Sequence, residues 1–280
     1  MTQCCYGGRV KQFFFAKEHI KLVSIFKELY QYREMIRSLI HRDLRGRYKG
    51  SVLGFLWTFI NPLLQLGVYT IVFSSIMRMG IDDYYLFLFV ALIPWMFCAT
   101  SIVGGSTCIL ANQNLVTKIY FPREVLPLAI VTSNFINMLY CFVIVLSVVV
   151  IFSDKTNFAA WLYLPLIAIL EYVLVLGMTF FFSALTVYFR DFEHILGILT
   201  MGWQFLTPVM YSVDMVPQEY LTFFNLNPMT PIITAYRDIL YYGKIPYLDT
   251  LIAGFIFSIL ILIVGFIVFN RLKRRFAEEL

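Results

Sequence analysis

Long apolar stretches separated by short polar segments dominate the pattern of residues along the chain. A hydrocarbon core about 30 Å thick is crossed by roughly 20 residues of a helix that rises about 1.5 Å per residue. Five uncharged stretches meet or approach that length, and they lie between Lys49 and Arg78, Asp83 and Lys118, Glu124 and Asp154, Glu193 and Asp214, and Asp249 and Arg271. A sixth, residues 158–189, is interrupted by Glu171. The pattern predicts an all-α integral membrane protein with about six transmembrane helices.

A polar arm, residues 1–50, precedes the first apolar stretch. Its apolar side chains recur at helical spacing, at Leu29, Tyr32, Ile36, Leu39, Ile40 and Leu44. Such spacing is typical of an amphipathic helix that lies on a membrane surface. We therefore expect a cytoplasmic arm with an interfacial helix (1–50), a six-span transmembrane domain (51–270) and a basic cytoplasmic tail (271–280).

The segment between Asp214 and Asp249 is too apolar for a water-exposed loop, above all at residues 220–226 and 232–242. Proline, which removes a backbone hydrogen bond from a helix, recurs in and just before this segment, at Pro208, Pro217, Pro228 and Pro231. Irregular backbone at membrane depth occurs only where protein or a water-filled cavity surrounds it. The sequence predicts short re-entrant or interfacial helices between spans five and six.

Composition and charge agree with a membrane protein and orient it. Of the 280 residues, 60% are hydrophobic and 14% are charged, whereas soluble domains have roughly half and about a quarter. The segments 1–50, 112–124, 190–194 and 271–280 share one side of a six-span topology and hold 18 of the 22 Lys and Arg residues. Cytoplasmic loops carry such an excess. We expect both termini in the cytoplasm, and we interpret the net charge of +5 as topological rather than as a nucleic-acid site.

The sequence lacks the familiar motifs of ATPases, kinases and metalloenzymes. There is no GxxxxGK[ST] phosphate loop. Residues 41–44 spell HRDL, but Tyr48 stands where the kinase motif requires Asn. The three histidines, His19, His41 and His194, are far apart and form no HExxH. We expect no catalytic residue, no metal and no cofactor in this chain.

A few residues within the apolar stretches are candidates for a transport pathway. An ionised carboxylate near the middle of a span is costly unless it faces water or a partner, so Glu171 is either part of a path or a hydrogen-bonded packing residue. Deep aromatic rings can stack against sugars, or can serve only for packing. These rings are Trp57, Tyr69, Phe97, Trp203 and Phe205.

Four stretches resemble the permease subunits of type 2 ABC exporters that move lipid-linked polysaccharides such as O-antigens, capsules and teichoic acids. The resemblance runs from about residue 32 to residue 276. The stretches are RDLRGRYKGSVLGFLWTFINPLL (42–64), NLVTKIYFPREVLPLA (114–129), YFRDFEHI (188–195), and the region from Leu206 through Tyr211 to NPMTPIITAYRDILYYG (227–243). The second stretch is the most specific of the four.

The resemblance implies that the second and third stretches dock on a separate ATPase. The implied docking residues are Asn114, Leu115, Lys118, Ile119, Tyr120, Phe121, Pro122, Arg123, Glu124, Arg190 and Asp191. Apolar residues 119–121 inside a polar rim have the composition of a small protein interface. A local ion pair of Arg190 with Asp191 is the alternative for the third stretch.

The fourth stretch corresponds in that family to short gate helices near the channel exit, which adds Tyr211, Asn227, Pro228 and Arg237 to the pathway candidates. At the inner surface, Arg47 and Lys49 could attract a lipid diphosphate or simply anionic lipid. The family also implies a second copy of this permease, two ATPase subunits that bind ATP and Mg, and a place in a bacterial or archaeal inner membrane.

Two other functions remain open at this stage. A type 2 exporter of a drug, haem or plain lipid would share the six-span architecture. A polytopic membrane transferase would require clustered acidic residues and histidine at one membrane face, and the sequence has no such cluster.

Overall fold

The computed structural model describes residues 27–47, 50, 52–153 and 155–280, and this part of the chain is helical without a strand. Lys49 and the first 26 residues of the arm lie outside the described residues. The longer helices are α2 (Arg33–Gly46), α3 (Trp57–Thr70), α4 (Tyr84–Ser106), α6 (Val125–Phe152), α8 (Leu164–Tyr188), α9 (Phe192–Leu206), α10 (Gln218–Leu226), α11 (Met229–Leu240) and α12 (Leu248–Leu272). Short elements join them: η1 (Gly54–Leu56), η2 (Ile71–Ile76), η3 (Leu110–Asn112), α5 (Gln113–Lys118), α7 (Phe158–Trp161), η4 (Val213–Met215), η5 (Lys273–Arg275) and α13 (Phe276–Glu279).

Five helices of the described chain are long and apolar enough to cross a membrane. They are Gly54–Ile76, Tyr84–Ser106, Val125–Phe152, Phe158–Tyr188 and Leu248–Arg275. The remaining expected span forms α9, which has 15 residues and a length of about 22 Å at 1.5 Å per residue. It ends before Pro208, where Thr207 takes an extended conformation. The stretch between Glu193 and Asp214 is therefore apolar over a greater length than it is helical.

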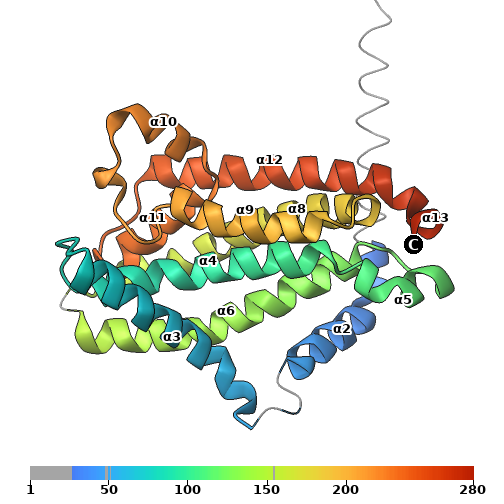
Figure 1. Ribbon diagram of the computed structural model, residues 1–280, viewed down its shortest axis with the longest axis horizontal. Coiled ribbons are helices and arrows are strands. Elements are labelled where there is room, and N and C mark those ends of the chain that lie inside the picture. Colours follow the sequence, from blue (N-terminus) through green and yellow to red (C-terminus); the bar gives the residue numbers. More distant parts are fainter. Residues whose placement is uncertain (1–26, 48–49, 51, 154) are drawn as a thin grey trace, which may run out of the picture.

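The two ends of the helix bundle are built differently (Figure 1). The arm helix α2, the short helix α5 and the tail helix α13 gather at one end. Helices α10 and α11, which connect α9 to α12 in the sequence, lie at the opposite end. The expected amphipathic helix and the expected pair of short helices are thus both present.

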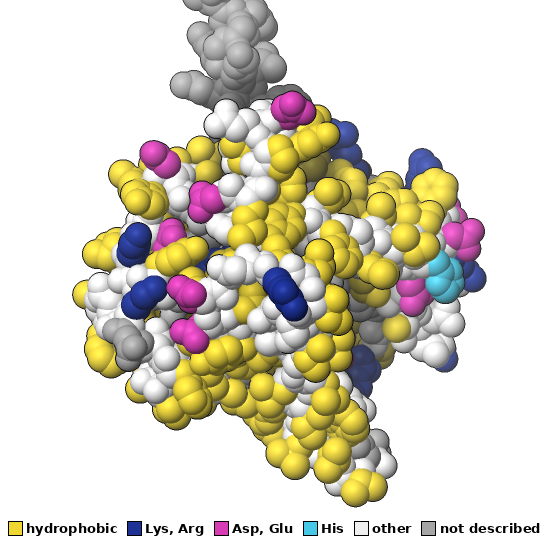
Figure 2. Space-filling view, turned by 60° about the vertical axis from the view of Figure 1, so that its left-hand side comes forward, with side chains coloured by type: hydrophobic (Ala, Val, Ile, Leu, Met, Phe, Trp, Pro, Cys, Tyr) yellow, Lys and Arg dark blue, Asp and Glu magenta, His cyan; other side chains and the backbone are white. Residues whose placement is uncertain are grey.

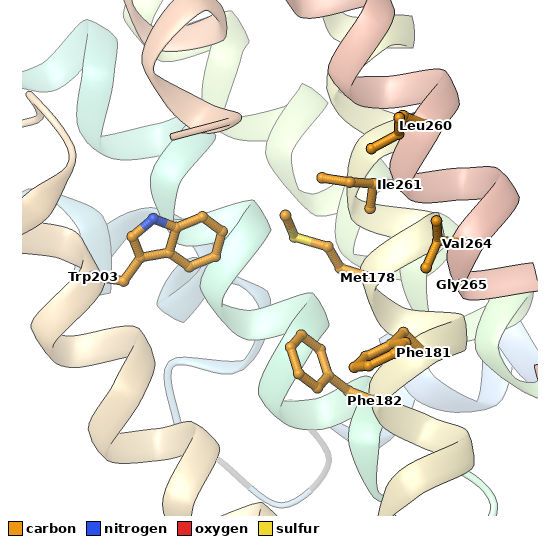
Figure 3. Close-up of a pocket in the computed structure, with 8 residues that line it drawn as sticks. All are labelled: Met178, Phe181, Phe182, Trp203, Leu260, Ile261, Val264 and Gly265. Carbon is orange, nitrogen blue, oxygen red and sulfur yellow. The ribbon is translucent and has the colours of Figure 1, made fainter. Parts of the chain in front are cut away.

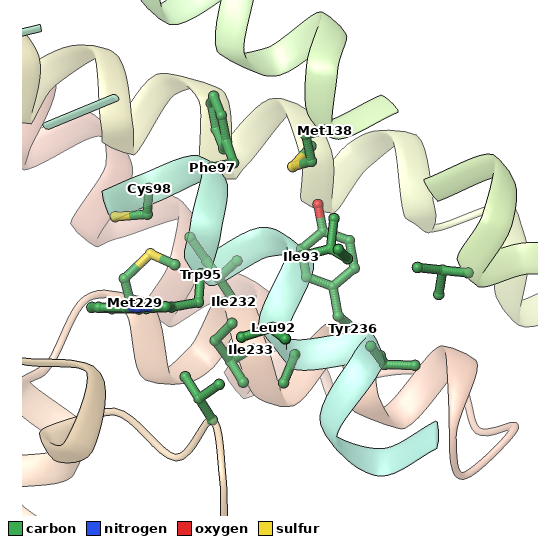
Figure 4. Close-up of a cluster of buried hydrophobic side chains, with 14 of the residues drawn as sticks. Leu92, Ile93, Trp95, Phe97, Cys98, Met138, Met229, Ile232, Ile233 and Tyr236 are labelled. Carbon is green, nitrogen blue, oxygen red and sulfur yellow. The ribbon is translucent and has the colours of Figure 1, made fainter. Parts of the chain in front are cut away.

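Helix α4 forms the centre of the bundle. It packs against α6, α8 and α11. Within its most apolar stretch of 18 residues, 78% are buried, against 6% in the corresponding stretch of the span that contains α3. Its core partners on α11 include Ile232, Ile233 and Tyr236 (Figure 4). Helix α3 instead leaves much of its apolar surface uncovered by the rest of the described chain.

Helices α8 and α12 pack against each other along their length and approach most closely at two glycines. A methyl carbon at Gly177 would lie 2.6 Å from the Cα atom of Leu262, and one at Gly265 would overlap the carbonyl oxygen of Gly177. Small residues permit such close backbone packing, which drives helix association in membranes. The hydroxyl of Ser258 also donates a hydrogen bond to the carbonyl oxygen of Leu170, at 2.9 Å. Together these contacts make α8 and α12 one tightly joined pair.

Candidate functional site

The connection between α4 and α6 carries an exposed apolar tip. After α5 ends at Lys118, Ile119 is extended, and 55% of its surface is exposed. The Tyr120 side chain is 95% exposed, although it is aromatic and flanked by apolar neighbours. Asn114 and Lys118 are also exposed, and Leu115 and Pro122 are half-buried. The exposed tip is therefore formed by Ile119 and Tyr120 with polar residues beside them.

The second half of the same connection turns into the protein. Phe121 is 5% exposed and packs in a core that it shares with Phe269 and Phe276. Glu124 is 2% exposed and forms an ion pair with Lys273. The Arg123 guanidinium donates a hydrogen bond to the Lys273 carbonyl oxygen.

The sequence-based interpretation of one continuous interface is therefore wrong in part. Phe121 is not an exposed apolar knob, and Glu124 is not part of an exposed polar rim, because both side chains are buried. The sequence could not show which of the two adjacent aromatic rings, Tyr120 or Phe121, would be exposed, because that depends on the direction in which the folded backbone turns each side chain. Their roles as docking residues remain predictions, and the geometry makes the Ile119–Tyr120 pair the accessible part.

The connection between α8 and α9 forms a second exposed turn at the same end. The side chain of Phe189 is exposed, as are Arg190 and Asp191. The described residues show no ion pair between Arg190 and Asp191, so the alternative of a local pair is not realised. Just before the turn, the Tyr188 hydroxyl donates a hydrogen bond to the Leu272 carbonyl oxygen at 2.9 Å. The turn is thus exposed at its tip and anchored to the end of α12.

At the opposite end, the segment after α9 is irregular and buried. Thr207, Pro208, Val209 and Met210 are buried, so their backbone groups require partners inside the protein. Arg237 supplies two of these partners, donating from Nη2 to the Val209 carbonyl oxygen at 2.8 Å and from Nη1 to that of Tyr211 at 3.1 Å.

Arg237 is itself held by its surroundings. It is buried, and its guanidinium carbon lies 3.7 Å from the centroid of the Phe87 ring. The Tyr84 hydroxyl contributes a further donor, to the Met210 carbonyl oxygen at 2.8 Å. Arg237 therefore provides hydrogen-bond donors to the non-helical segment after α9. Its side chain is buried and does not line an open channel exit.

Asn227 bonds to the start of the same segment, at the end of α9. Its Nδ2 donates to the Leu206 carbonyl oxygen at 3.1 Å and to the Thr207 hydroxyl at 2.9 Å. Its Oδ1 accepts from the indole nitrogen of Trp203 at 3.1 Å and from the backbone nitrogen of Met229 at 3.0 Å. Asn227 thus ties the end of α9 to the start of α11, beside the half-buried Pro228.

Glu171 is fully buried in α8 and meets the α11 side chain Tyr236. The Tyr236 hydroxyl donates to Glu171 Oε2 at 2.9 Å, while Oε1 has no hydrogen-bond partner among the described residues. Tyr236 also packs against Phe142, with ring centroids 5.3 Å apart. Of the two sequence-based alternatives, this geometry supplies the partner that a packing role requires.

The other pathway candidates do not converge on one site. Arg47 bonds to Asp43 and Asn134 and lines a small polar pocket with Phe97. On α3, the Tyr69 hydroxyl accepts from the Gln65 amide at 3.0 Å, and Trp57 is half-buried. Phe205 is exposed on α9, and Tyr211 donates its hydroxyl hydrogen to the Phe205 carbonyl oxygen. The candidates therefore divide among the pocket beside Arg47, α3, the α8–α11 contact, and α9 with the segment that follows it.

Trp203 lines the apolar pocket between α8, α9 and α12 shown in Figure 3. The pocket has a volume of about 270 Å³, and Met178, Phe181 and Leu260 are among the side chains around it. Hydrophobic side chains also cover much of the face in Figure 2, with charged residues interspersed. Apolar surface of this kind is expected where lipid or another helix contacts a membrane protein.

Sequence reasoning missed three contributors to these sites. Tyr236, Lys273 and Tyr84 each act through a partner distant in the sequence. For Tyr236 the available signal was a carboxylate in an apolar span, which requires a donor but does not identify it. For the other two, ordinary positions near helix ends gave no signal.

Comparison with known proteins gives the family. The family model described as ABC-2 type transporter matches residues 34–241. The chain is 34% identical to the O-antigen export system permease protein RfbA of Myxococcus xanthus, over 92% of this chain and 100% of that protein. It is 34% identical to a protein of the same name from Klebsiella pneumoniae, over 88% of this chain and 95% of that protein. The polysialic acid transport protein KpsM of Escherichia coli is 25% identical, over 75% of this chain and 82% of that protein.

The family model and the individual relatives both agree with the fold of long apolar helices joined by short connections. They also agree with the resemblance identified from the four sequence stretches. The matched region includes α2, the exposed tip at Tyr120, the turn at Arg190 and the segment held by Arg237. The chain belongs to the ABC-2 type transporter family.

Proposed function

We propose that this chain is the permease subunit of an ATP-driven exporter that moves a lipid-linked polysaccharide outward across the cytoplasmic membrane. The observation that carries the proposal is the match over nearly the whole chain to O-antigen export permeases. The more distant polysialic acid relative supports the same class of cargo. A second cargo class, such as a drug, haem or plain lipid, has no comparable observation in its favour.

Energy comes from a separate ATPase subunit, two copies of which bind ATP and Mg. The proposed docking surface consists of Ile119 and Tyr120 together with the turn at Phe189 and Arg190. These residues lie at one end of the bundle and expose apolar side chains beside charged ones, as a compact protein interface requires. On this proposal that end faces the cytoplasm, and the excess of Lys and Arg in segments 1–50, 112–124, 190–194 and 271–280 supports the orientation.

Two copies of the chain form the transport path. Support comes from α3, because the span that contains it is only 6% buried by the described part of the chain, against 78% for the span of α4. A second copy would cover part of that apolar surface, and lipid would cover the rest. ATP-driven closure of the two ATPases then rocks the docked ends of the helices and parts the spans, a rigid-body type of switch.

The export proposal is tested with the purified permease and its ATPase in proteoliposomes that contain a lipid-linked polysaccharide. ATP should move the glycan to the far side of the membrane, where a membrane-impermeant glycosidase or lectin detects it. A catalytically inactive ATPase is the control. Export of a drug, haem or an unglycosylated lipid under the same conditions, without movement of the glycan, would reject polysaccharide as the cargo.

Docking is tested separately by co-purification of the ATPase with Ile119→Ala/Tyr120→Ala permease. We expect loss of the complex without loss of folded permease, because both side chains are exposed. Ile245→Ala, which truncates an exposed apolar side chain away from both docking segments, is the matched control. Retention of the complex by the double variant would refute this docking surface.

A further inference from the structure

After α12 the chain continues into a short tail. The tail contacts the connection between α4 and α6 and the end of α8. Elements η5 (Lys273–Arg275) and α13 (Phe276–Glu279) follow α12 at the end of the bundle that also holds α5 (Figure 1). The tail packs against α5 and α8. It therefore lies between the two segments assigned above to ATPase docking.

Its contacts with the first connection are polar and paired. Lys273 forms an ion pair with the buried Glu124, and the Lys273 carbonyl oxygen accepts a hydrogen bond from Arg123. The side chain and the backbone of one tail residue thus bind two consecutive residues of the connection. Removing one partner of a buried ion pair leaves an uncompensated charge and is strongly destabilising.

Its apolar anchor is Phe276, which is fully buried. The ring lies 5.7 Å from that of Phe269 and 6.4 Å from that of Tyr188, centroid to centroid. The Arg123 guanidinium carbon lies 5.8 Å from the Phe276 centroid, within the range of a cation–π contact. One side chain therefore touches the residue that opens the second turn and a residue of the first connection.

We propose that this C-terminal tail positions the docking surface, with Lys273 and Phe276 as positioning residues that hold the Tyr120 tip and the Arg190 turn as one rigid unit. The coupling role rests on the proposed function. Motion of the ATPase at either segment is then transmitted to the other and to α8 and α12 together. Without the tail, the exposed tip would still be present but could yield locally instead of moving the bundle.

The anchoring itself is tested on the permease alone, in nanodiscs, by limited trypsin digestion. Arg123 is half-buried and bonded to the tail, whereas Lys118 in the same connection is exposed. We expect Lys273→Ala to raise the rate of cleavage after Arg123, relative to that after Lys118, by roughly tenfold or more, because loss of the ion pair favours local opening. Arg274→Ala, which removes an exposed neighbouring cation, should leave the ratio unchanged. An unchanged ratio in Lys273→Ala would overturn the proposal.

Coupling is tested with the ATPase present, as glycan exported per ATP hydrolysed. We expect this ratio to fall several-fold in Lys273→Ala, and to recover in Lys273→Arg and in the exchanged pair Glu124→Lys/Lys273→Glu. Mere loss of folded protein would lower export and hydrolysis equally and leave the ratio unchanged, which would reject a positioning role. If Lys273→Ala does not yield folded protein, Phe276→Leu replaces it with the same expected fall.

The two proposals fail in distinguishable ways. Absence of any complex between the wild-type permease and the ATPase would overturn the proposed function and, with it, the coupling role. A normal complex with normal export per ATP in the tail variants would leave the proposed function intact and overturn only the tail's role.

Discussion

The two ends of the bundle differ in how their non-helical backbone is accommodated. At the end with the tail, the connection around Tyr120 leaves its tip exposed and fixes its base through Glu124 and Arg123. At the other end, the segment after α9 is buried, and side chains of Arg237 and Asn227 satisfy its carbonyl groups one by one. Exposed carbonyl groups can bond to water, but buried ones need donors from the protein.

On the proposed function, this difference separates residues expected to contact the ATPase from residues that hold the fold. A side chain at the first end can be exposed because little of the fold depends on it, as with Tyr120. Arg237 and Asn227 at the second end were pathway candidates by sequence, yet among the described residues their side chains donate to Val209, Tyr211, Leu206 and Thr207 and so hold the segment after α9. Substitutions at the two ends should therefore separate assembly from stability.

The largest effect on stability is expected at the α8–α12 contact, because these two helices run the length of the bundle and connect its two ends. Gly265→Ala places a methyl group on the carbonyl oxygen of Gly177, and backbone cannot give way as a side chain can. We expect a loss of more than about 3 kcal/mol, seen as failure to accumulate or as early thermal unfolding in detergent. Gly202→Ala on α9, where no atom of the described residues lies within 4 Å of the added carbon, is the matched control and should behave like wild type. Equal stability of the two variants would contradict the close approach.

Arg237→Ala should follow in size. It removes the donors to one buried and one half-buried carbonyl group and the cation above Phe87, which should destabilise the protein by about 3 kcal/mol. Thermal unfolding followed by circular dichroism measures the change, with the exposed Arg271→Ala as control. If Arg237→Ala unfolds like wild type but loses export, the residue lines the pathway after all.

Asn227→Ala is expected to cost about 2 kcal/mol, because the carbonyl group of Leu206 and the indole of Trp203 both lose their partner. Asn225→Ala, two residues earlier and exposed on α10, provides a matched control. The same unfolding measurement applies. A larger effect of Asn225→Ala would reverse the assignment of the structural asparagine.

Much of the fold could be predicted from the apolar pattern, because spans, amphipathic helices and proline breaks leave periodic signals. The arm helix and the two short helices were predicted in this way, and five of the long apolar stretches contain helices of sufficient length. The apolar pattern could not show that α9 would be short, since Val209 and Met210, which follow it, are as apolar as the residues of a span but lie buried in a turn and a bend.

The candidate site was less predictable, because its decisive contacts join residues far apart in the sequence. The YFPRE stretch indicated the proposed docking connection, but Phe121 is buried in a core that includes the tail residue Phe276, whereas Tyr120 is exposed. Glu171 indicated a buried polar contact, and only the position of α11 identified Tyr236 as its partner.

The smallest effect on stability and the most direct test of the docking assignment concern Tyr120 itself. Replacing Tyr120, and in a second variant Phe121, with a photocrosslinking amino acid allows both positions to be compared in the assembled exporter. We predict a crosslink from position 120 to the ATPase subunit and, from position 121, crosslinks only within the permease. A crosslink to the ATPase from position 121 but not from position 120 would contradict the account.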